Sequence, residues 1–178
     1  MADTETHPMK RLIRAIMDQE SDFRPSAISK EGAVGLMQVV PEFAFEYGYG
    51  VPSLATFARE MGFDTGQETV ADAHNLLHDP VLNERMGRSI FEGLLKHHGG
   101  DLRAALTAYN LGAPTYSEWV AAGSNPENLN DEARNYASGV ISNYERMYGR
   151  PPPATRAAGC ASTSRSSRPI GARHGRRN

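Results

Sequence analysis

The sequence lacks several features that would assign it to a well-defined protein class. It has a single cysteine, Cys160, among 178 residues, which excludes an internal disulfide. It contains no internal repeat, no Walker or dinucleotide-binding motif and no cysteine pattern of a metal site. The N-terminal stretch MADTETHPMKRL has acids first and no long apolar run. We therefore expect neither a secretory signal nor a transmembrane span, and delivery by another agent to any target outside the membrane.

The overall composition is that of an ordinary globular domain, but the charge is unevenly distributed. The chain is 39% hydrophobic and 22% charged. Residues 151–178 contain six arginines and no acid, which leaves 13 basic against 21 acidic residues in 1–150. We predict one domain over residues 1–150 and a disordered basic tail over 151–178, because this tail has almost no apolar surface to bury. The tail either attracts nucleic acid or an anionic envelope, or is a solvated extension.

Helical periodicity dominates residues 8–148, whereas strand signals are weak, so a mainly α fold is predicted. Helices are expected over about 8–20, around Pro41, from 80 to the Gly99-Gly100 pair, from Asp101 to about Gly112, and over about 130–148. Residues 50–75 are interpreted as an insertion with one short helix. The apolar stripe of the helix that starts at residue 80 comprises Val81, Leu82, Met86, Ile90, Leu94 and Leu95.

The helix predicted over 8–20 carries an acid on its apolar face. At 100° per residue, its apolar stripe comprises Ile13, Ile16 and Met17. Glu20 lies near the middle of that stripe, whereas Asp18 and Asp22 point to the far, solvated side. Burial disfavours the charged form of a carboxyl group, so an unpaired Glu20 should have a raised pKa, as a general acid requires. The alternative is that Glu20 forms an ion pair with Arg14 or Arg24.

Five short motifs follow one another in a recognisable order. They are Glu20-Ser21, GLMQ at 35–38, DPVLNERMG, AYN at 108–110 and ARNYASGVISNY. Together they resemble the catalytic domain of the soluble lytic transglycosylases, a lysozyme-like superfamily related to goose-type lysozyme. The resemblance covers about residues 8–148 and implies a single lysozyme-like domain with a substrate groove.

The resemblance implies roles for several residues. Glu20 corresponds to the sole catalytic acid, and Ser21 is expected near the substrate's N-acetyl group or the acid's hydrogen bonds, with a helix C-terminal hydroxyl as the alternative. Tyr109 is expected to hydrogen-bond Glu20 or the acetamido group, and Asn110 to orient the surrounding backbone. Tyr136 is expected to face the acid.

The GLMQ motif has the residue types that a sugar site needs. Gly35, with Gly32, permits close approach of the backbone to a sugar, Met37 offers a soft apolar wall, and the Gln38 amide both donates and accepts hydrogen bonds. The alternative is that Leu36 and Met37 are core residues, and we assign Leu36 to the core.

No metal or other cofactor is expected. His74 and His78 are spaced as i and i+4, but no third ligand accompanies them, so solvated histidines are the preferred interpretation, and the same holds for His97-His98. Asn83 matches an asparagine at the start of the family's central helix, and we expect a structural role for it.

The resemblance predicts a peptidoglycan lytic transglycosylase that cleaves the β-1,4 bond between N-acetylmuramic acid and N-acetylglucosamine, with 1,6-anhydro-muramic acid as product. Glu20 acts first as acid and then as base, which explains why one buried carboxylate suffices. The alternatives are a lysozyme-type muramidase, with Glu31 or Glu42 as second acid, and a non-catalytic peptidoglycan-binding protein.

The expected partner is the peptidoglycan glycan strand, and nucleic acid is a weaker candidate, bound through the arginine-rich tail. Because no signal peptide is expected, the chain is interpreted as phage-encoded. It is then either an endolysin, cytoplasmic until holin-dependent release, or a virion-associated enzyme that contacts phage structural proteins.

Overall fold

The computed structural model describes residues 7–153, and within this range the chain is helical. The α-helices are α1 (Pro8–Ser21), α2 (Leu54–Glu60), α3 (Val70–Leu76), α4 (Pro80–His97), α5 (Leu102–Leu111), α6 (Ala113–Ala121) and α7 (Asp131–Tyr148), with 3-10 turns η2 (Pro41–Phe43) and η3 (Pro126–Asn128). The described residues contain no β-strand, and only isolated bridges join Val34 to Ile28 and Val39. The predicted mainly α fold is confirmed.

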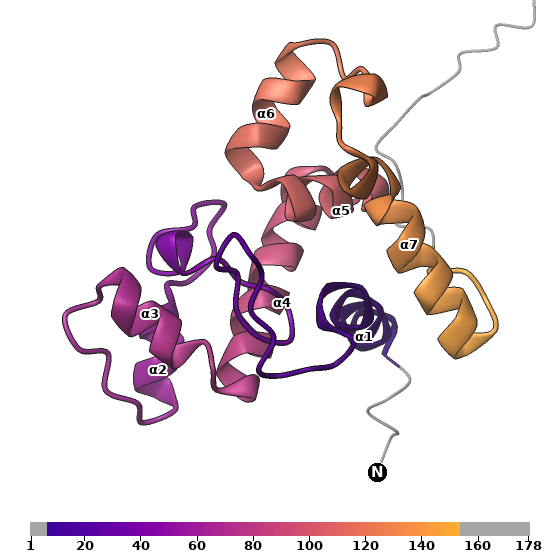
Figure 1. The fold of residues 1–178 in the computed structure, drawn as a ribbon. Helices are drawn as coiled ribbons and strands as arrows, with labels where there is room; N and C mark the ends of the chain where they lie inside the picture. The colour runs from indigo at the N-terminus through magenta and orange to yellow at the C-terminus, as the bar shows by residue number, and fades with distance from the viewer. Residues whose placement is uncertain (1–6, 154–178) are drawn as a thin grey trace, which may run out of the picture.

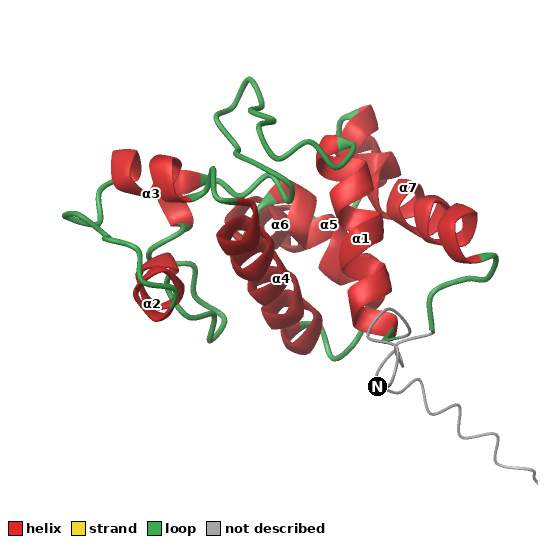
Figure 2. Cartoon of the chain, turned by 90° about the horizontal axis from the view of Figure 1, so that it is seen from below, coloured by secondary structure: helices red, strands yellow, loops and turns green. Residues whose placement is uncertain are grey.

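Helix α4 lies in the middle of the molecule, with α2 and α3 on one side and α1 and α7 on the other (Figures 1 and 2). Helix α5 packs against α4 and α7, and α6 packs against α5. Buried side chains from α1, α4, α5, α7 and the loop before η2 form one continuous hydrophobic core. The burial of this shared apolar surface fixes the ends of α1, α5 and α7 relative to one another.

Most helix ends are set by local signals that the sequence displays. Pro8 occupies the first turn of α1, where its missing N–H leaves no hydrogen bond unmade. The side chains of Asp101 and Asn130 accept hydrogen bonds from the first turns of α5 and α7. Gly112, with φ of 75°, ends α5. The predicted bounds of these helices are therefore confirmed to within one or two residues.

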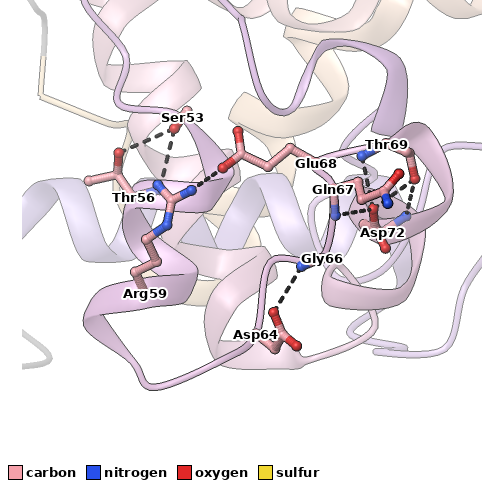
Figure 3. Close-up of polar contacts among 9 residues, drawn as sticks. All are labelled: Ser53, Thr56, Arg59, Asp64, Gly66, Gln67, Glu68, Thr69 and Asp72. Carbon is pink, nitrogen blue, oxygen red and sulfur yellow. Dashed lines mark hydrogen bonds and ion pairs between the residues drawn. The ribbon is translucent and has the colours of Figure 1, made fainter.

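Residues 50–75 contain two short helices, where the sequence predicts one. The Ser53 side chain caps α2, and Thr69 and Asp72 form a reciprocal capping box at the start of α3 (Figure 3). Arg59 of α2 forms an ion pair with Glu68, directly before α3 (Figure 3). The second helix was missed because seven residues make only about two turns, too few for a periodic pattern.

Helix α6 was also missed. It starts directly after Gly112, with a proline in its first turn, and most of its side chains are exposed or half-buried. Because α6 rests on α5 without burying a full apolar face, its sequence shows no strong stripe.

One residue of the stripe predicted for α4 is wrongly placed. Val81 is 61% exposed, because it lies in the first turn of α4 and points away from the core. The other residues of that stripe, Leu82, Met86, Ile90, Leu94 and Leu95, are buried.

The predicted basic tail, with Cys160, lies outside the described residues beyond Pro153. No helix in the described part of the chain combines the length and the apolar composition that a membrane span requires.

Candidate active site

Glu20 lies in the last turn of α1 and lines a groove with a cavity volume of about 610 Å³. No arginine or lysine of the described residues forms an ion pair with it. Arg14 lies over the Phe23 ring, 5.4 Å from its centroid, and Arg24 Nε donates to the Ser21 carbonyl at 2.9 Å. The alternative of an ion pair between Glu20 and Arg14 or Arg24 is therefore wrong.

The neighbours of Glu20 on α1 hold this helix against α7. Asp18, predicted to be solvated, is only 12% exposed at its side chain and forms an ion pair with Arg146 of α7, so this prediction is wrong. The Asn143 side chain donates to the Gln19 side chain at 3.2 Å. A Cβ at Gly139 would lie 2.6 Å from Gln19 Oε1, so the bare glycine lets α7 approach α1 closely. These contacts hold the end of α1 against residues 139–146 of α7, close to the preceding turn of that helix.

Tyr136 of α7 meets Glu20 as a result. Its ring is buried, and its hydroxyl donates a hydrogen bond to Oε1 of Glu20. Burial raises the pKa of the Glu20 carboxyl to about 7. The hydrogen bond from Tyr136 lowers this pKa and the charge of Glu132 raises it, both less than burial does. Glu20 is therefore present in both its protonated and its ionised form near neutral pH, as acid–base catalysis requires.

Tyr109 lines the same groove but does not hydrogen-bond the acid. Its hydroxyl donates to the Met37 carbonyl at 2.8 Å, and its ring packs edge-on against Phe91. Burial and the nearby Glu20 raise the pKa of Tyr109 well above its usual value, so the hydroxyl stays protonated. Tyr109 therefore ties α5 to the GLMQ segment and presents its ring to the groove.

The side chain of Asn83, on α4, holds the GLMQ segment in place through hydrogen bonds to its backbone and to the neighbouring backbone. Its Oδ1 accepts from the Met37 N–H at 2.9 Å, and its Nδ2 donates to the Val34 and Leu77 carbonyls at 2.7 and 3.0 Å. Asn83 is fully buried, and these three bonds satisfy its amide. The expected structural role of Asn83 is confirmed.

The structure brings five of the eight predicted site residues to the groove: Glu20, Gln38, Tyr109, Asn110 and Tyr136. The Gln38 amide nitrogen donates to the Gly35 and Ala27 carbonyls, which leaves its oxygen as the group available to a ligand. The Asn110 amide nitrogen is 3.4 Å from Oε1 of Glu132.

The other three predicted residues, Ser21, Gly35 and Met37, are buried and do not line the groove. Gly35 has φ of 80°, and a Cβ there would lie 2.3 Å from Asn83 Nδ2, so this glycine makes room for Asn83 rather than for a sugar. Met37 is fully buried, as in the core alternative. The Ser21 hydroxyl faces the Leu36 carbonyl at 2.9 Å, as in the helix C-terminal alternative.

The groove also contains residues that the sequence did not single out, among them Glu132 and Tyr47. Glu132 lies four residues before Tyr136 on α7, a spacing that places both side chains on one helix face and could have revealed it. Tyr47 lines the groove from the loop after η2, and burial raises its pKa to about 12. Of the two acids weighed as a second carboxylate, Glu31 lines the groove and Glu42 does not.

The histidine pairs lie outside this groove. The His74 and His78 rings meet edge to face, with centroids 4.9 Å apart. Within residues 7–153, no group of three or more histidine, cysteine or acidic side chains could hold a metal ion.

A comparison with protein families matches residues 1–131 to the family described as Transglycosylase SLT domain. The chain belongs to this family. The match confirms the resemblance seen in the motifs. It ends at residue 131, before Glu132 and Tyr136, which both line the groove.

The SLT domain is also similar to individual proteins. It is 35% identical over 109 residues to the membrane-bound lytic murein transglycosylase C of Shigella sonnei, and 34% identical over the same length to that of Edwardsiella ictaluri. Each alignment covers 57% of this chain and 26% of the relative. The chain thus spans about a quarter of the length of these curated relatives.

Solved structures share the fold. The 70 kDa soluble lytic transglycosylase of Escherichia coli superposes with a TM-score of 0.56 at 23% identity, over 83% of this chain and 23% of that one. An inactive mutant of the lytic transglycosylase Slt of Pseudomonas aeruginosa gives 0.54 over the same shares, also at 23% identity. A 70 kDa soluble lytic transglycosylase in complex with bulgecin A gives 0.60 at 23% identity, over 84% of this chain and 23% of that one. These likenesses confirm the lysozyme-like fold.

Proposed function

We propose that this SLT domain is a peptidoglycan lytic transglycosylase that cleaves the β-1,4 bond between N-acetylmuramic acid and N-acetylglucosamine. The observation that carries the proposal is the state of Glu20: a carboxyl without a cationic partner among the described residues, with a pKa raised by burial to about 7, at the wall of a groove of about 610 Å³. Family membership and the curated relatives named lytic murein transglycosylase support the same substrate class.

The reaction begins with Glu20 in its protonated form. Its proton passes to the glycosidic oxygen, the bond from that oxygen to the anomeric carbon breaks, and the N-acetylglucosamine side leaves as an alcohol. The acetamido oxygen of the muramic acid residue bonds to the anomeric carbon and stabilises the positive charge there. One carboxyl group therefore serves where most glycosidases need two.

In the second step, ionised Glu20 takes the proton of the muramic 6-hydroxyl. The 6-oxygen attacks the anomeric carbon, the bond to the acetamido oxygen breaks, and a 1,6-anhydro ring closes. Glu20 ends protonated, ready for another cycle, and no water is consumed. Both steps use the same carboxyl group, so a pKa near the working pH suits the reaction.

The other groove residues have supporting roles in this proposal. Tyr136 holds Glu20 in one orientation through its hydrogen bond and, as a donor, stabilises the ionised form between the two steps. The Gln38 side-chain oxygen and the Tyr109 ring line the groove and contact the sugar.

The test is mass spectrometry of the muropeptides that the full chain and its Glu20→Gln variant release from purified peptidoglycan. Products that end in 1,6-anhydro-muramic acid, formed by the wild type and absent with the variant, are the expected result. Reducing ends from the wild type would contradict ring closure and indicate hydrolysis. No release by either protein would favour a binding role.

Hydrolysis by a lysozyme-type mechanism is the second candidate, and Glu132 is the observation that favours it. This second carboxylate lines the groove and is close enough to raise the pKa of Glu20. In a hydrolase it would activate water in place of the muramic 6-hydroxyl. A Glu132→Gln variant separates the two: a hydrolase loses its activity, whereas a transglycosylase retains its anhydro products.

Phage origin, and action either as a released endolysin or as a virion part, stay predictions of the sequence. Proteomics of purified particles from the source of the gene tests them: peptides of this chain in the particle support the virion role, and their absence together with cell lysis on expression with a holin supports the endolysin role.

A further inference from the structure

A second cavity lies beside the groove and takes no part in the reaction proposed above. It has a volume of about 270 Å³. Half of its lining residues carry rings: Tyr49 from the loop after η2, His97 and His98 at the end of α4, and Tyr116 of α6. Ala108 of α5 lines this second cavity, whereas the next residues of α5 line the groove, so the two cavities lie on different faces of α5. Figure 1 shows α6 folded over α5 at this end of the molecule. We call the second cavity the aromatic pocket.

The rings of the aromatic pocket form an unbroken row. Tyr49 meets His97 edge to face at 4.6 Å between centroids, His97 meets His98 at 5.0 Å, and His98 meets Tyr116 at 4.9 Å. Edge-to-face contacts of this kind hold rings in fixed orientations. The pocket wall is therefore a built surface rather than a chance group of exposed side chains.

The row also connects the aromatic pocket to the groove. Tyr47 lines the groove, and its ring centroid is 6.4 Å from that of Tyr49, which lines the pocket. Neighbouring rings therefore line the two cavities, Tyr47 the groove and Tyr49 the aromatic pocket. Continuity of this kind favours a ligand that occupies both cavities over an unrelated one.

The hydrogen-bonding groups on these rings indicate which class of ligand the aromatic pocket can hold. Among the described residues, the side chains of His97, His98 and Tyr116 are engaged in ring contacts and accept or donate no hydrogen bond. Burial, with His97 beside it, lowers the pKa of His98, so at neutral pH its ring is uncharged and offers one donor and one acceptor. The Tyr116 hydroxyl offers the same pair. A pyranose has apolar C–H faces and hydroxyl edges, which match ring faces and two-way hydrogen-bonding partners.

We propose that the aromatic pocket is an accessory site that holds one pyranose ring of a glycan strand whose other sugars lie in the groove. The proposal rests on the proposed function, since it takes the same substrate. The volume is just below the usual range of about 300–1,000 Å³ for ligand pockets, which fits a single sugar ring. Because the two cavities bind the same glycan strand, the contact in the aromatic pocket raises the affinity for long strands more than for short ones.

The test is an NMR titration of the full chain, in its Glu20→Gln form so that nothing is cleaved, with the N-acetylglucosamine trimer chitotriose as probe. The expected result is saturable shifts of Gln38 and Asn110 in the groove and, separately, of the His98 and Tyr116 rings in the pocket. Tyr116→Ala should abolish the pocket shifts and leave those of the groove. Tyr148→Ala, which removes a half-buried tyrosine at the end of α7, should change neither set.

Binding to insoluble peptidoglycan supplies the second readout. Tyr116→Ala should bind about threefold to tenfold more weakly than the parent, as expected for the loss of one ring contact. Tyr116→Phe keeps the ring and should lie between the two, which guards against a folding defect in the alanine variant. Circular dichroism confirms that each variant is folded.

The outcomes separate the two proposals. Groove shifts without pocket shifts would overturn the accessory site and leave the proposed function standing. Pocket shifts without groove shifts would support the accessory site and count against the proposed function. Pocket shifts produced by N-acetyl-phenylalanine amide but not by chitotriose would overturn the assignment to a sugar, because they would show a site for an apolar side chain.

Discussion

The hydroxyl of Tyr136 donates a hydrogen bond to the carboxylate of Glu20 across 116 residues of sequence. The contact joins the last turn of α1 to the first half of α7, and it is the one hydrogen bond to the Glu20 side chain among the described residues. It works against burial, because a donor stabilises the ionised carboxylate that burial disfavours. The pKa of Glu20 is the balance of these opposed effects and the charge of Glu132.

The pH dependence of activity follows from that balance. The pKa of Glu20 is raised to about 7, and the first step needs the protonated form, so kcat/KM should fall as the pH rises through about 7. Turbidity loss of purified peptidoglycan, measured from pH 4 to 9, gives the profile. Below pH 7, where Glu20 is protonated, Glu20→Gln should lose about 10³-fold in rate. A flat profile in the wild type would contradict Glu20 as the acid.

Removal of the Tyr136 hydroxyl should shift the alkaline limb of the pH–activity profile, which is the fall in activity as the pH rises. Tyr136→Phe deletes the bond that lowers the pKa of Glu20, so the alkaline limb should shift to higher pH, with a lower maximal rate because the carboxyl is less well oriented. The same turbidity assay measures both effects. A change in rate without a shift of the limb would mean that Tyr136 only positions the acid.

Glu132→Gln should shift the alkaline limb of the pH–activity profile in the opposite direction, to lower pH. The charge of Glu132 raises the pKa of Glu20, so its removal lets Glu20 ionise more readily and moves the alkaline limb to lower pH. The glutamine can still accept from the Asn110 amide, which keeps the local geometry. Glu31→Gln is the matched control, since Glu31 lines the groove but does not affect the pKa of Glu20. Equal shifts in both variants would mean a general effect of net charge.

The buried acid should also make stability depend on pH. The pKa of Glu20 rises from 4.5 in the unfolded chain to about 7 in the folded one, so its stabilising contribution is complete below pH 4.5 and is lost as the pH rises through 7. Glu20→Gln has no charge to bury, so at pH 8 it should exceed the wild type by about 3 kcal/mol in free energy of unfolding. At pH 4 the two should be equal. Thermal unfolding should show a gap of about 6–12 °C at pH 8, and the same gap at both pH values would contradict the linkage.

Asn83 should matter for stability rather than for chemistry. Asn83→Ala leaves the Met37 N–H and the Leu77 carbonyl buried without their partner, at a cost of about 3 kcal/mol in free energy of unfolding, or roughly 6–12 °C in Tm. The exposed Asn75 of α3 supplies the control variant Asn75→Ala, which should unfold within a degree or two of the wild type. Equal Tm values for both variants would show that the Asn83 bonds contribute nothing net.

Sequence reasoning succeeded where the deciding forces are local. The position of Glu20 on the apolar stripe of α1, the Asp101 cap of α5 and the glycine at its end follow from helix geometry and hydrogen bonding within one turn. It failed where a segment has too few turns for a pattern, as in α3, or buries too little, as in α6. The five ordered motifs predicted the family, and the comparison with protein families confirms it.

What only the tertiary structure decided is which side chains meet. The sequence by itself determined that an acid stands among apolar residues, but it could not show that Arg14 and Arg24 turn to other partners or that Asp18 pairs with Arg146. It also could not separate the groove residues from Ser21, Gly35 and Met37. These three belong to the same motifs, but they are buried and do not line the groove. Periodicity fixes the face of a helix, whereas the partner of that face depends on packing between segments more than a hundred residues apart, and burial there sets the pKa of Glu20.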